Sequence, residues 1–269
     1  MLEITSIARS FGGIPVLKDI SMTVRSGEIV GLLGPNGSGK STLLNIISGF
    51  LPATSGGIAF KGHSISGWAS HRVANAGMRR TFQLPQMPLG MSCAEVLMTA
   101  VPQPLGSSIV SLMTRFGAVA AERRAAHDLV QEMLDMLQLG SVADRPAGLL
   151  SGGQQKLLAL GAAVLGGAEM VLLDEPTAGV APPLRKELVE MLKRFRDRGV
   201  TLLVVEHDMG FIGSLCDRCV VLDQGYVIAN CRPDELMTNG KVVAAYLGMS
   251  GARKVDAAAQ STAAKEALT

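Results

Sequence analysis

The stretch GPNGSGKST, residues 34–42, constrains this chain more than any other part of its sequence. It matches the pattern G-x-x-x-x-G-K-[ST], follows the apolar run EIVGLL and precedes the helix-like run STLLNIISGF. Glycines let such a loop turn so tightly that consecutive N–H groups face one phosphate, and the following helix adds its positive end. The sequence therefore predicts a strand, a phosphate-binding loop and a helix, in that order.

The loop residues have distinct predicted tasks at a nucleoside triphosphate. Lys40 is expected to reach the β- and γ-phosphates, and the hydroxyl of Ser41 is expected to bind Mg²⁺. The residues predicted to surround the phosphates are Gly34, Pro35, Asn36, Gly37, Ser38, Gly39, Lys40, Ser41 and Thr42.

A second segment, EMVLLDEP at 169–176, supplies acidic groups of the kind that such a site needs. Its four apolar residues predict a buried strand that ends at Asp174. Phosphates bind at the carboxyl ends of parallel strands, so Asp174 is placed to bind Mg²⁺. Glu175 follows directly and is the candidate to orient or deprotonate an attacking water.

The pattern along the chain predicts an α/β fold. Short strand patterns in 1–60 indicate a small β-rich part, and 91–147 carries helical periodicity. From 168 onward apolar strands alternate with amphipathic helices, which is typical of a parallel sheet covered on both faces. In the helix expected at 120–140, the apolar side is predicted to hold Leu129, Met133, Leu134, Met136 and Leu137. Residues 102–117 are expected to form a connector and 250–269 a disordered tail.

Composition excludes several classes of protein. With 25 Lys and Arg against 23 Asp and Glu, the net charge of +2 lacks the basic surface of a nucleic-acid binder. The chain shows no signal peptide and no apolar run of membrane-spanning length, yet 48% of its residues are hydrophobic. We expect part of this apolar surplus to cover a partner. Cys216 and Cys219 form C-x-x-C without a second ligand pair, so they are expected to be reduced and packed as small hydrophobic residues.

A second Gly-rich helix start lies at GLLSGGQQKL, residues 148–157. Ser151 is predicted to cap the helix, and Gly152 and Gly153 would let its backbone approach an anion. The spacing leaves two alternatives open. The two Gly-rich ends could hold one nucleotide within a single chain, or two different nucleotides.

Taken together, these motifs resemble those of the ATP-binding subunits of ABC transporters. GPNGSGKST is similar to their Walker A motif, LSGGQ (150–154) to their signature, and MVLLDEP to their Walker B motif. TFQ (81–83), TAGVAP (177–182) and EHD (206–208) resemble the Q-loop, the D-loop and the switch histidine. The resemblance spans residues 3–248. It implies a P-loop ATPase domain over 1–249, with a mixed or parallel core sheet, a small antiparallel β subdomain and a helical subdomain at about 84–165.

The resemblance also implies roles for further residues. Phe11 would stack on adenine with Val16 below it, although Phe11 could instead be an aromatic residue of a β-core. Gln83 would sense Mg²⁺ and water, and His207 would contact the γ-phosphate. The signature residues Ser151, Gly152, Gly153 and Gln154 would meet the ATP held by a second ATPase subunit in a head-to-tail dimer. ATP hydrolysis with Mg²⁺ would then drive the cycle.

Two positions depart from the common pattern. Ala181 stands where the D-loop often has Asp or Asn, and Gly161 stands where the signature helix often has Arg. Neither position belongs to the phosphate or metal groups, so hydrolysis is still expected.

Within the family, RSFGG, RRTFQ, GVAP, EHDM and VVAAYLG resemble the ATPases of branched-chain amino-acid, amide or urea importers. This implies work at the cytoplasmic face of the plasma membrane with permease subunits, an external solute-binding protein and a second ATPase, identical or different. The Met-rich segment 83–97 is expected to offer a permease helix an apolar groove. The alternatives are a lipopolysaccharide-export ATPase, a soluble ABC ATPase outside transport, and a catalytically silent regulatory module, which the intact Glu175 and His207 disfavour.

Overall fold

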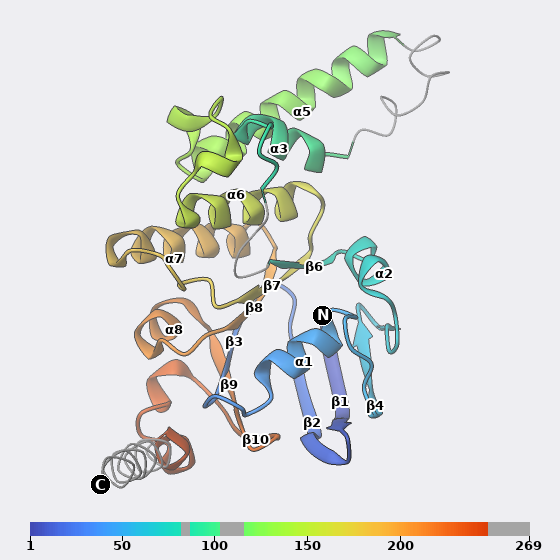
Figure 1. The fold of residues 1–269 in the computed structure, drawn as a ribbon, viewed down its shortest axis with the longest axis vertical. Helices are drawn as coiled ribbons and strands as arrows, with labels where there is room; N and C mark the ends of the chain where they lie inside the picture. The colour runs from blue at the N-terminus through green and yellow to red at the C-terminus, as the bar shows by residue number, and fades with distance from the viewer. Residues whose placement is uncertain (82–86, 103–115, 247–269) are drawn as a thin grey trace, which may run out of the picture.

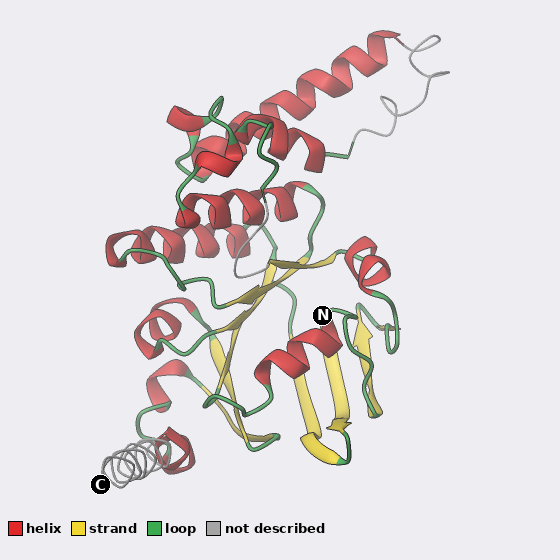
Figure 2. Ribbon diagram, viewed as in Figure 1, coloured by secondary structure: helices red, strands yellow, loops and turns green. Residues whose placement is uncertain are grey.

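The computed structural model describes residues 1–81, 87–102 and 116–246, which contain two β-sheets and the helices that cover them (Figures 1 and 2). The strands are β1 (Leu2–Phe11), β2 (Ile14–Val24), β3 (Ile29–Leu33), β4 (Ser55–Phe60), β5 (His63–Ser64), β6 (Met78–Thr81), β7 (Met170–Asp174), β8 (Thr201–Val205), β9 (Arg218–Asp223) and β10 (Tyr226–Cys231). The helices are α1 (Lys40–Ile47), α2 (Ser70–Asn75), α3 (Cys93–Ala100), α5 (Phe116–Met136), α6 (Gly152–Leu165), α7 (Pro182–Asp197) and α8 (Met209–Leu215). Short 3₁₀ turns lie at Gly140–Val142, Ala147–Leu149 and Pro233–Glu235.

The larger sheet has the strand order β10-β9-β3-β8-β7-β6. Its strands run parallel from β9 to β6, and β10 pairs antiparallel with β9. The central strands β3 and β8 are buried along their whole length, which only an apolar run covered on both faces can tolerate. The predicted mixed, largely parallel core sheet is confirmed.

The smaller sheet is antiparallel and has the order β2-β1-β4-β5. The sequence grouped EIVGLL with the β-rich residues 1–60, but β3 belongs to the larger sheet, between β8 and β9. The length of these strands and their pattern of burial explain the difference. Strand β3 is a five-residue buried run, whereas β1 and β2 alternate buried and exposed positions as a half-covered sheet does.

The larger sheet divides the interior into two hydrophobic cores. Along β3, Ile29 and Leu33 face the core built with α3, α5, α6, α7 and α8, whereas Val30 and Leu32 face the core shared with α1 and the smaller sheet. This alternation follows from the two-residue period of a strand. Figure 2 shows the same layering, with α1 between the two sheets and the remaining large helices on the other side.

Helices α3, α5 and α6 pack together at one end of the molecule, next to α7 (Figure 1). A capping box at Ser92 and Glu95 starts α3. Helix α5 buries Ala126, Val130, Met133 and Leu134, and Leu137, directly after the helix, is buried as well.

The prediction for Leu129 was wrong. Its side chain is 46% exposed, because Val130, one position and about 100° further round the helix, faces the bundle. The predicted connector is helical from Phe116 onward. Its residues 103–115 and the predicted disordered tail lie outside the described residues. In the three described ranges no helix combines the length and apolarity needed to cross a membrane.

Candidate active site

The loop between β3 and α1 lies where the sequence predicts a phosphate-binding loop, at 34–42. Gly34 has a φ of 144° and Gly39 a φ of 105°. A Cβ on Gly34 would lie 2.1 Å from the carbonyl oxygen of Leu222, and one on Gly39 would lie 2.5 Å from Cδ2 of Leu17. Both positions therefore require glycine, for backbone angle and for space. At these two positions the loop packs directly against Leu222 and Leu17, so no side chain can stand between them.

Lys40, the first residue of α1, folds its side chain back over this loop. Its Nζ donates to the carbonyl oxygens of Gly34 (2.7 Å) and Pro35 (2.9 Å). Burial lowers the pKa of Lys40, and the charges of Glu175 and Asp174 partly offset that effect. The loop, the ammonium and both predicted acids therefore share one neighbourhood.

The loop fits the phosphates of a nucleotide. The side chain of Ser38 is 2% exposed, and its Oγ finds no hydrogen-bond partner within the described residues. A buried hydroxyl without a partner is satisfied when an acceptor such as a phosphate oxygen arrives. Asn36, Gly37 and Ser41 are exposed at the mouth of the loop, and Thr42 is half-buried. Ser41 and Asp174 are oxygen ligands of the kind that Mg²⁺ takes.

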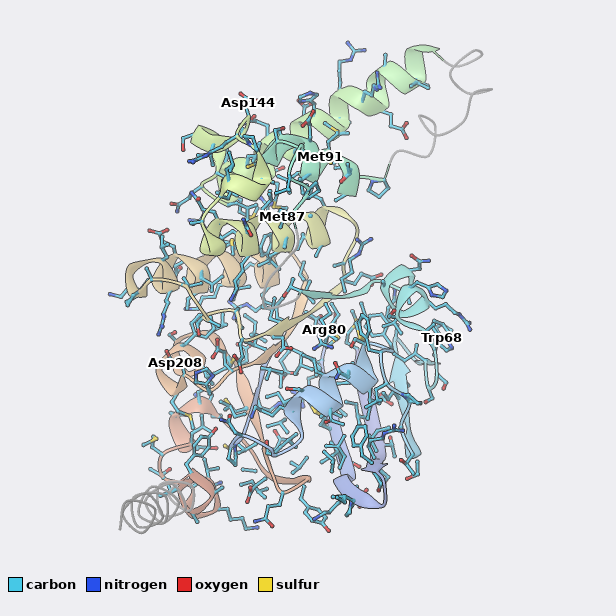
Figure 3. The ribbon with its side chains drawn as sticks, viewed as in Figure 1. Trp68, Arg80, Met87, Met91, Asp144 and Asp208 are labelled. Atoms are coloured by element: carbon cyan, nitrogen blue, oxygen red, sulfur yellow. The ribbon has the colours of Figure 1, made fainter. Side chains whose placement is uncertain are left out.

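Asp174 ends β7, and an arginine that the sequence did not single out meets it there. Nη2 of Arg80, from the neighbouring strand β6, lies 2.9 Å from Oδ2 of Asp174, and both side chains are almost buried. Nη1 of Arg80 donates to Oδ1 of Asn45 (2.6 Å) and Oγ of Ser48 (3.2 Å) on the helix α1 side. Figure 3 shows Arg80 near the middle of the molecule. It joins the acidic end of β7 to the helix that follows the phosphate loop.

Glu175 and His207 lie together where β7 and β8 end. Glu175 has the left-handed φ of 47°, and its N–H donates to the carbonyl oxygen of Val205 (2.9 Å). This angle turns the chain away from the strand direction immediately after Asp174. Nδ1 of His207 is 3.9 Å from Oε1 of Glu175, and 63% of the His207 side chain is exposed. Both side chains are therefore open to a ligand at this edge.

The signature segment forms the predicted helix start. Oγ of Ser151 accepts from the N–H of Gln154 (3.3 Å), and Oε1 of Gln154 accepts from the N–H of Ser151 (3.1 Å). This reciprocal capping box fixes the first turn of α6. A Cβ on Gly152 would meet nothing within 4 Å, and neither Gly152 nor Gly153 has a positive φ. Nothing within the described chain therefore requires glycine at 152.

The remaining predicted nucleotide contacts are Phe11, Val16 and Gln83, of which the structure describes the first two. Phe11, at the end of β1, is 43% exposed and 4.7 Å from the guanidinium of Arg9, so it is not an aromatic residue of a β-core. Val16 is half-buried, and its carbonyl oxygen lies 3.3 Å from a Cβ placed on Gly39, beside the phosphate loop. Gln83 lies outside the described residues.

The cysteines behave as small hydrophobic residues, as predicted. Cys216 and Cys219 are free and buried, and burial raises the pKa of the Cys219 thiol to about 12. Thiols held in this protonated form are poor nucleophiles and poor metal ligands. Within the residues that the structure describes, no three His, Cys, Asp or Glu side chains are grouped as a metal site would need.

Sequence reasoning missed several contacts besides Arg80. The hydroxyl of Tyr246 accepts from the N–H of Gly34 (3.0 Å), so the helical residues 240–246 support the base of the phosphate loop. Lys156 and the buried Glu206 contact the chain just after Asp174. No sequence signal marks such pairs, because their members lie 19 to 212 residues apart.

A parallel sheet whose strand β3 ends in a glycine-rich loop, with a lysine and two acids close to that loop, defines the class of P-loop nucleoside triphosphatases. The chain is therefore a member of this class.

Comparison with known proteins gives the family. The model of the ABC transporter family matches residues 17–178, more than half of the chain. The chain is 32% identical over 249 residues to the high-affinity branched-chain amino acid transport ATP-binding protein BraF of Pseudomonas aeruginosa, covering 92% of this chain and 98% of that protein. It is 34% identical over 248 residues to the probable branched-chain amino acid transport ATP-binding protein LivG of Archaeoglobus fulgidus, covering 92% and 95%.

Solved structures agree with these matches. A nucleotide-free ATP-binding cassette from an ABC transporter superposes with a TM-score of 0.76 at 34% identity, covering 91% of this chain and 98% of that chain. A cassette in its ADP conformation superposes with a TM-score of 0.76 at 33% identity, covering 92% and 98%. The chain belongs to the ABC transporter family, and it is the subunit that binds and hydrolyses ATP.

Proposed function

We propose that this chain powers the import of branched-chain amino acids or related small amides. The support is that relatives covering nearly its whole length carry branched-chain amino acid transport in their names. In this proposal the chain works at the cytoplasmic face of the plasma membrane, bound to permease subunits, and an external solute-binding protein delivers the cargo.

The proposed catalytic roles follow the geometry of the site. Lys40 holds the β- and γ-phosphates, while Phe11 and Val16 contact the adenine. Ser41 and Asp174, with Gln83, hold Mg²⁺. When bound, this ion supplies positive charge to the phosphate oxygens.

Glu175 then accepts a proton from the attacking water, and His207 contacts the γ-phosphate beside it. Their 3.9 Å separation lets both groups reach one phosphate and its water. Hydrolysis removes the anion that these groups hold.

The observation that carries the proposed assembly is the open space at Gly152. Neither packing nor backbone angle requires glycine there, and the N-terminal end of α6 is capped but uncovered. Helix starts with free backbone N–H groups bind anions. We therefore favour two nucleotides for the two Gly-rich ends. Ser151, Gly152, Gly153 and Gln154 of one subunit close on the ATP held by a second ATPase subunit, identical or different, in a head-to-tail pair.

The helical subdomain at about 84–165 is proposed to transmit this closure to the permease. Met87 and Met91, labelled in Figure 3, are half-buried and pack against the core shared by α3, α5, α6, α7 and α8. We therefore place them at the edge of the proposed contact surface, not in an open groove. Flexible methionine side chains at such a rim adapt to the shape of a partner helix. If Met91→Asp leaves partner binding intact in a folded protein, this surface lies elsewhere.

One variant tests the chemistry. Glu175→Gln keeps the size of the side chain but cannot accept the proton of the attacking water. We expect it to bind ATP as tightly as the unmodified chain and to lose turnover by a factor on the order of 10² or more. Undiminished hydrolysis would remove Glu175 from its proposed role.

Co-purification tests the transport role. The chain is tagged, membranes are solubilised gently, and the subunits that remain attached are identified by mass spectrometry. Import would be supported by the recovery of polytopic permeases together with a second ATPase and a solute-binding protein. Recovery with lipopolysaccharide-export subunits, or with ribosomes or DNA-processing proteins, would reject the importer and leave only the ATPase chemistry.

A further inference from the structure

The loop after Asp174 is held from two sides by charged side chains that the proposed mechanism does not use. Residues 175–178 carry the proposed base and lead into α7. On one side lies Lys156, in the second turn of α6. On the other lies Glu206, at the end of β8, whose side chain is fully buried.

Lys156 binds the carbonyl oxygens of this loop. Its Nζ donates to the carbonyls of Glu175 (3.3 Å), Pro176 (3.5 Å) and Ala178. The amine reaches across from the helical bundle to the core, beside a cavity of about 500 Å³ that α6 and α7 line. Burial lowers the pKa of Lys156, while the charges of Glu206 and Glu175 act against that shift. Both carboxylates are thus within electrostatic reach of the ammonium.

Glu206 binds the donors of the same loop. Its Oε1 accepts from the backbone N–H of Thr177 (2.9 Å) and from the Thr177 hydroxyl. Its Oε2 accepts from the N–H of His207 (3.0 Å). A carboxylate without solvent contact needs such a set of donors, so its position is tightly determined.

Between Lys156 and Glu206, the backbone of Glu175 adopts a conformation that is unfavourable without contacts from the surrounding residues. Its φ of 47° lies in the left-handed region, which is unfavourable for a residue other than glycine and persists only where the surroundings determine it. The carbonyl of Glu175 accepts from Lys156 and from the N–H of Ala178 (3.1 Å). This angle decides where the Glu175 carboxylate points.

We propose that Lys156 and Glu206 are positioning residues that clamp the loop 175–178 and aim the carboxylate of Glu175 at the attacking water. Because Lys156 belongs to the helix that begins with the signature, the clamp also ties the orientation of α6 to the catalytic loop. The inference rests on the proposed role of Glu175.

The test uses the complex purified through a tag on the full chain. Lys156→Met keeps the aliphatic stem and removes the donor. We expect kcat to fall on the order of 10- to 100-fold, because a misdirected base costs about this much. The dissociation constant for ATP should stay unchanged, since none of the Lys156 hydrogen bonds reaches the phosphate loop. Lys156→Arg keeps a charged donor and should recover most of kcat.

Two controls separate positioning from general stability. Lys193→Met removes the same charge from α7. Within the described residues Lys193 pairs with Glu190 of its own helix, at 3.7 Å, and the change should leave kcat unchanged. Single-turnover rates are also measured for Lys156→Met in the Glu175→Gln background. If Lys156 acts through Glu175, Lys156→Met should not lower the single-turnover rate of the Glu175→Gln variant any further.

The outcomes distinguish the two claims. If Glu175→Gln retains turnover, the proposed role of Glu175 fails, and the clamp fails with it. If Glu175→Gln loses turnover but Lys156→Met does not, only the clamp is wrong. The clamp is also wrong if Lys156→Arg does not restore kcat. It is wrong as well if Lys156→Met lowers the rate of the Glu175→Gln variant by the same factor as it lowers that of the unmodified chain.

Discussion

At the scale of single residues, the ion pair between Arg80 and Asp174 is the contact most directly tied to the proposed Mg²⁺ site. The pair is almost buried, so both charges have lost most of their water. Breaking such a pair is costly because the remaining charge has no comparable partner. Bound Mg²⁺ would neutralise the same carboxylate that Arg80 neutralises here.

Arg80→Met should therefore lower the free energy of unfolding by about 3 kcal/mol without nucleotide. The loss should shrink when Mg²⁺ and ADP saturate the site, because the ion replaces the missing charge. Urea titrations with EDTA, and with Mg²⁺ and ADP, measure both values. Arg124→Met, on the exposed face of α5, is the control and should change little. A loss below about 1 kcal/mol would show that the pair stabilises no more than a surface salt bridge.

Glu28 offers a prediction about pH. Burial alone would raise its pKa, but hydrogen bonds from the Arg218 side chain and the Arg25 N–H outweigh burial and hold the pKa below its ordinary value of 4.5. Arg218 contacts both carboxylate oxygens, at 2.9 and 3.1 Å. A lowered pKa in the folded state gives stability that is complete above pH 4.5 and is lost as the pH falls through the folded value.

Glu28→Gln should thus lower the free energy of unfolding by roughly 1–3 kcal/mol at pH 7. The gap between the two proteins should begin to close below pH 4.5 and disappear as the pH falls through the lowered pKa of folded Glu28, because the unmodified side chain is then neutral as well. Denaturant titrations from pH 7 to 3 give the two curves. Parallel curves across this range would contradict the assignment.

These residues also show what the sequence can and cannot predict. The phosphate loop was predictable because its function depends on glycines and a helix start that are adjacent in the chain. Arg80, Lys156 and Glu206 were not, because each acts through a partner that only the sheet order brings near. Asp174 itself was predictable from its place after an apolar strand, but the arginine beside it was not.

At the scale of elements, α6 and α5 approach each other through Gly161. A Cβ on this residue would lie 2.6 Å from Cδ1 of Leu137, directly after α5, and 3.1 Å from Cγ of Met133, on α5; both side chains are buried. The absence of a basic residue at 161, noted from the sequence, thus has a packing reason. The helical pattern predicted α5 itself, but which of Leu129 and Val130 faces inward depends on α3 and α6.

Gly161→Arg should push α5 away from α6 and bury a charge without a partner. We expect the free energy of unfolding to fall by roughly 2–4 kcal/mol. Gly213→Arg, in α8, is the matched control, because a Cβ there meets nothing within 4 Å. That change should be neutral or stabilise the helix by up to about 1 kcal/mol. Thermal and urea unfolding compare the two variants, and equal effects would contradict the packing argument.

At the scale of the whole molecule, the two Gly-rich helix starts lie in different parts of the chain. Figure 1 shows α1 beside the smaller sheet and α6 in the helical bundle at the other end, with the larger sheet between them. From the sequence alone, the two Gly-rich helix starts could bind one nucleotide together or two nucleotides separately. This separation favours the head-to-tail pair, in which each nucleotide uses the loop of one subunit and the signature of the other.

Mixing two inactive variants tests that arrangement. Lys40→Ala damages the phosphate loop, and Ser151→Arg fills the space in front of α6. In a mixed pair, the loop of the Ser151→Arg chain meets the signature of the Lys40→Ala chain, so one intact site forms. Random pairing should restore about a quarter of the original ATPase activity if sites act independently.

The control mixes Lys40→Ala with Glu175→Gln. Both residues act on the nucleotide of their own chain, so every composite site in this mixture is damaged and no activity should return. Cross-linking verifies that mixed pairs form in both samples. If the Lys40→Ala and Ser151→Arg chains pair but stay inactive, the signature does not serve the partner's nucleotide, and the uncovered start of α6 needs another ligand.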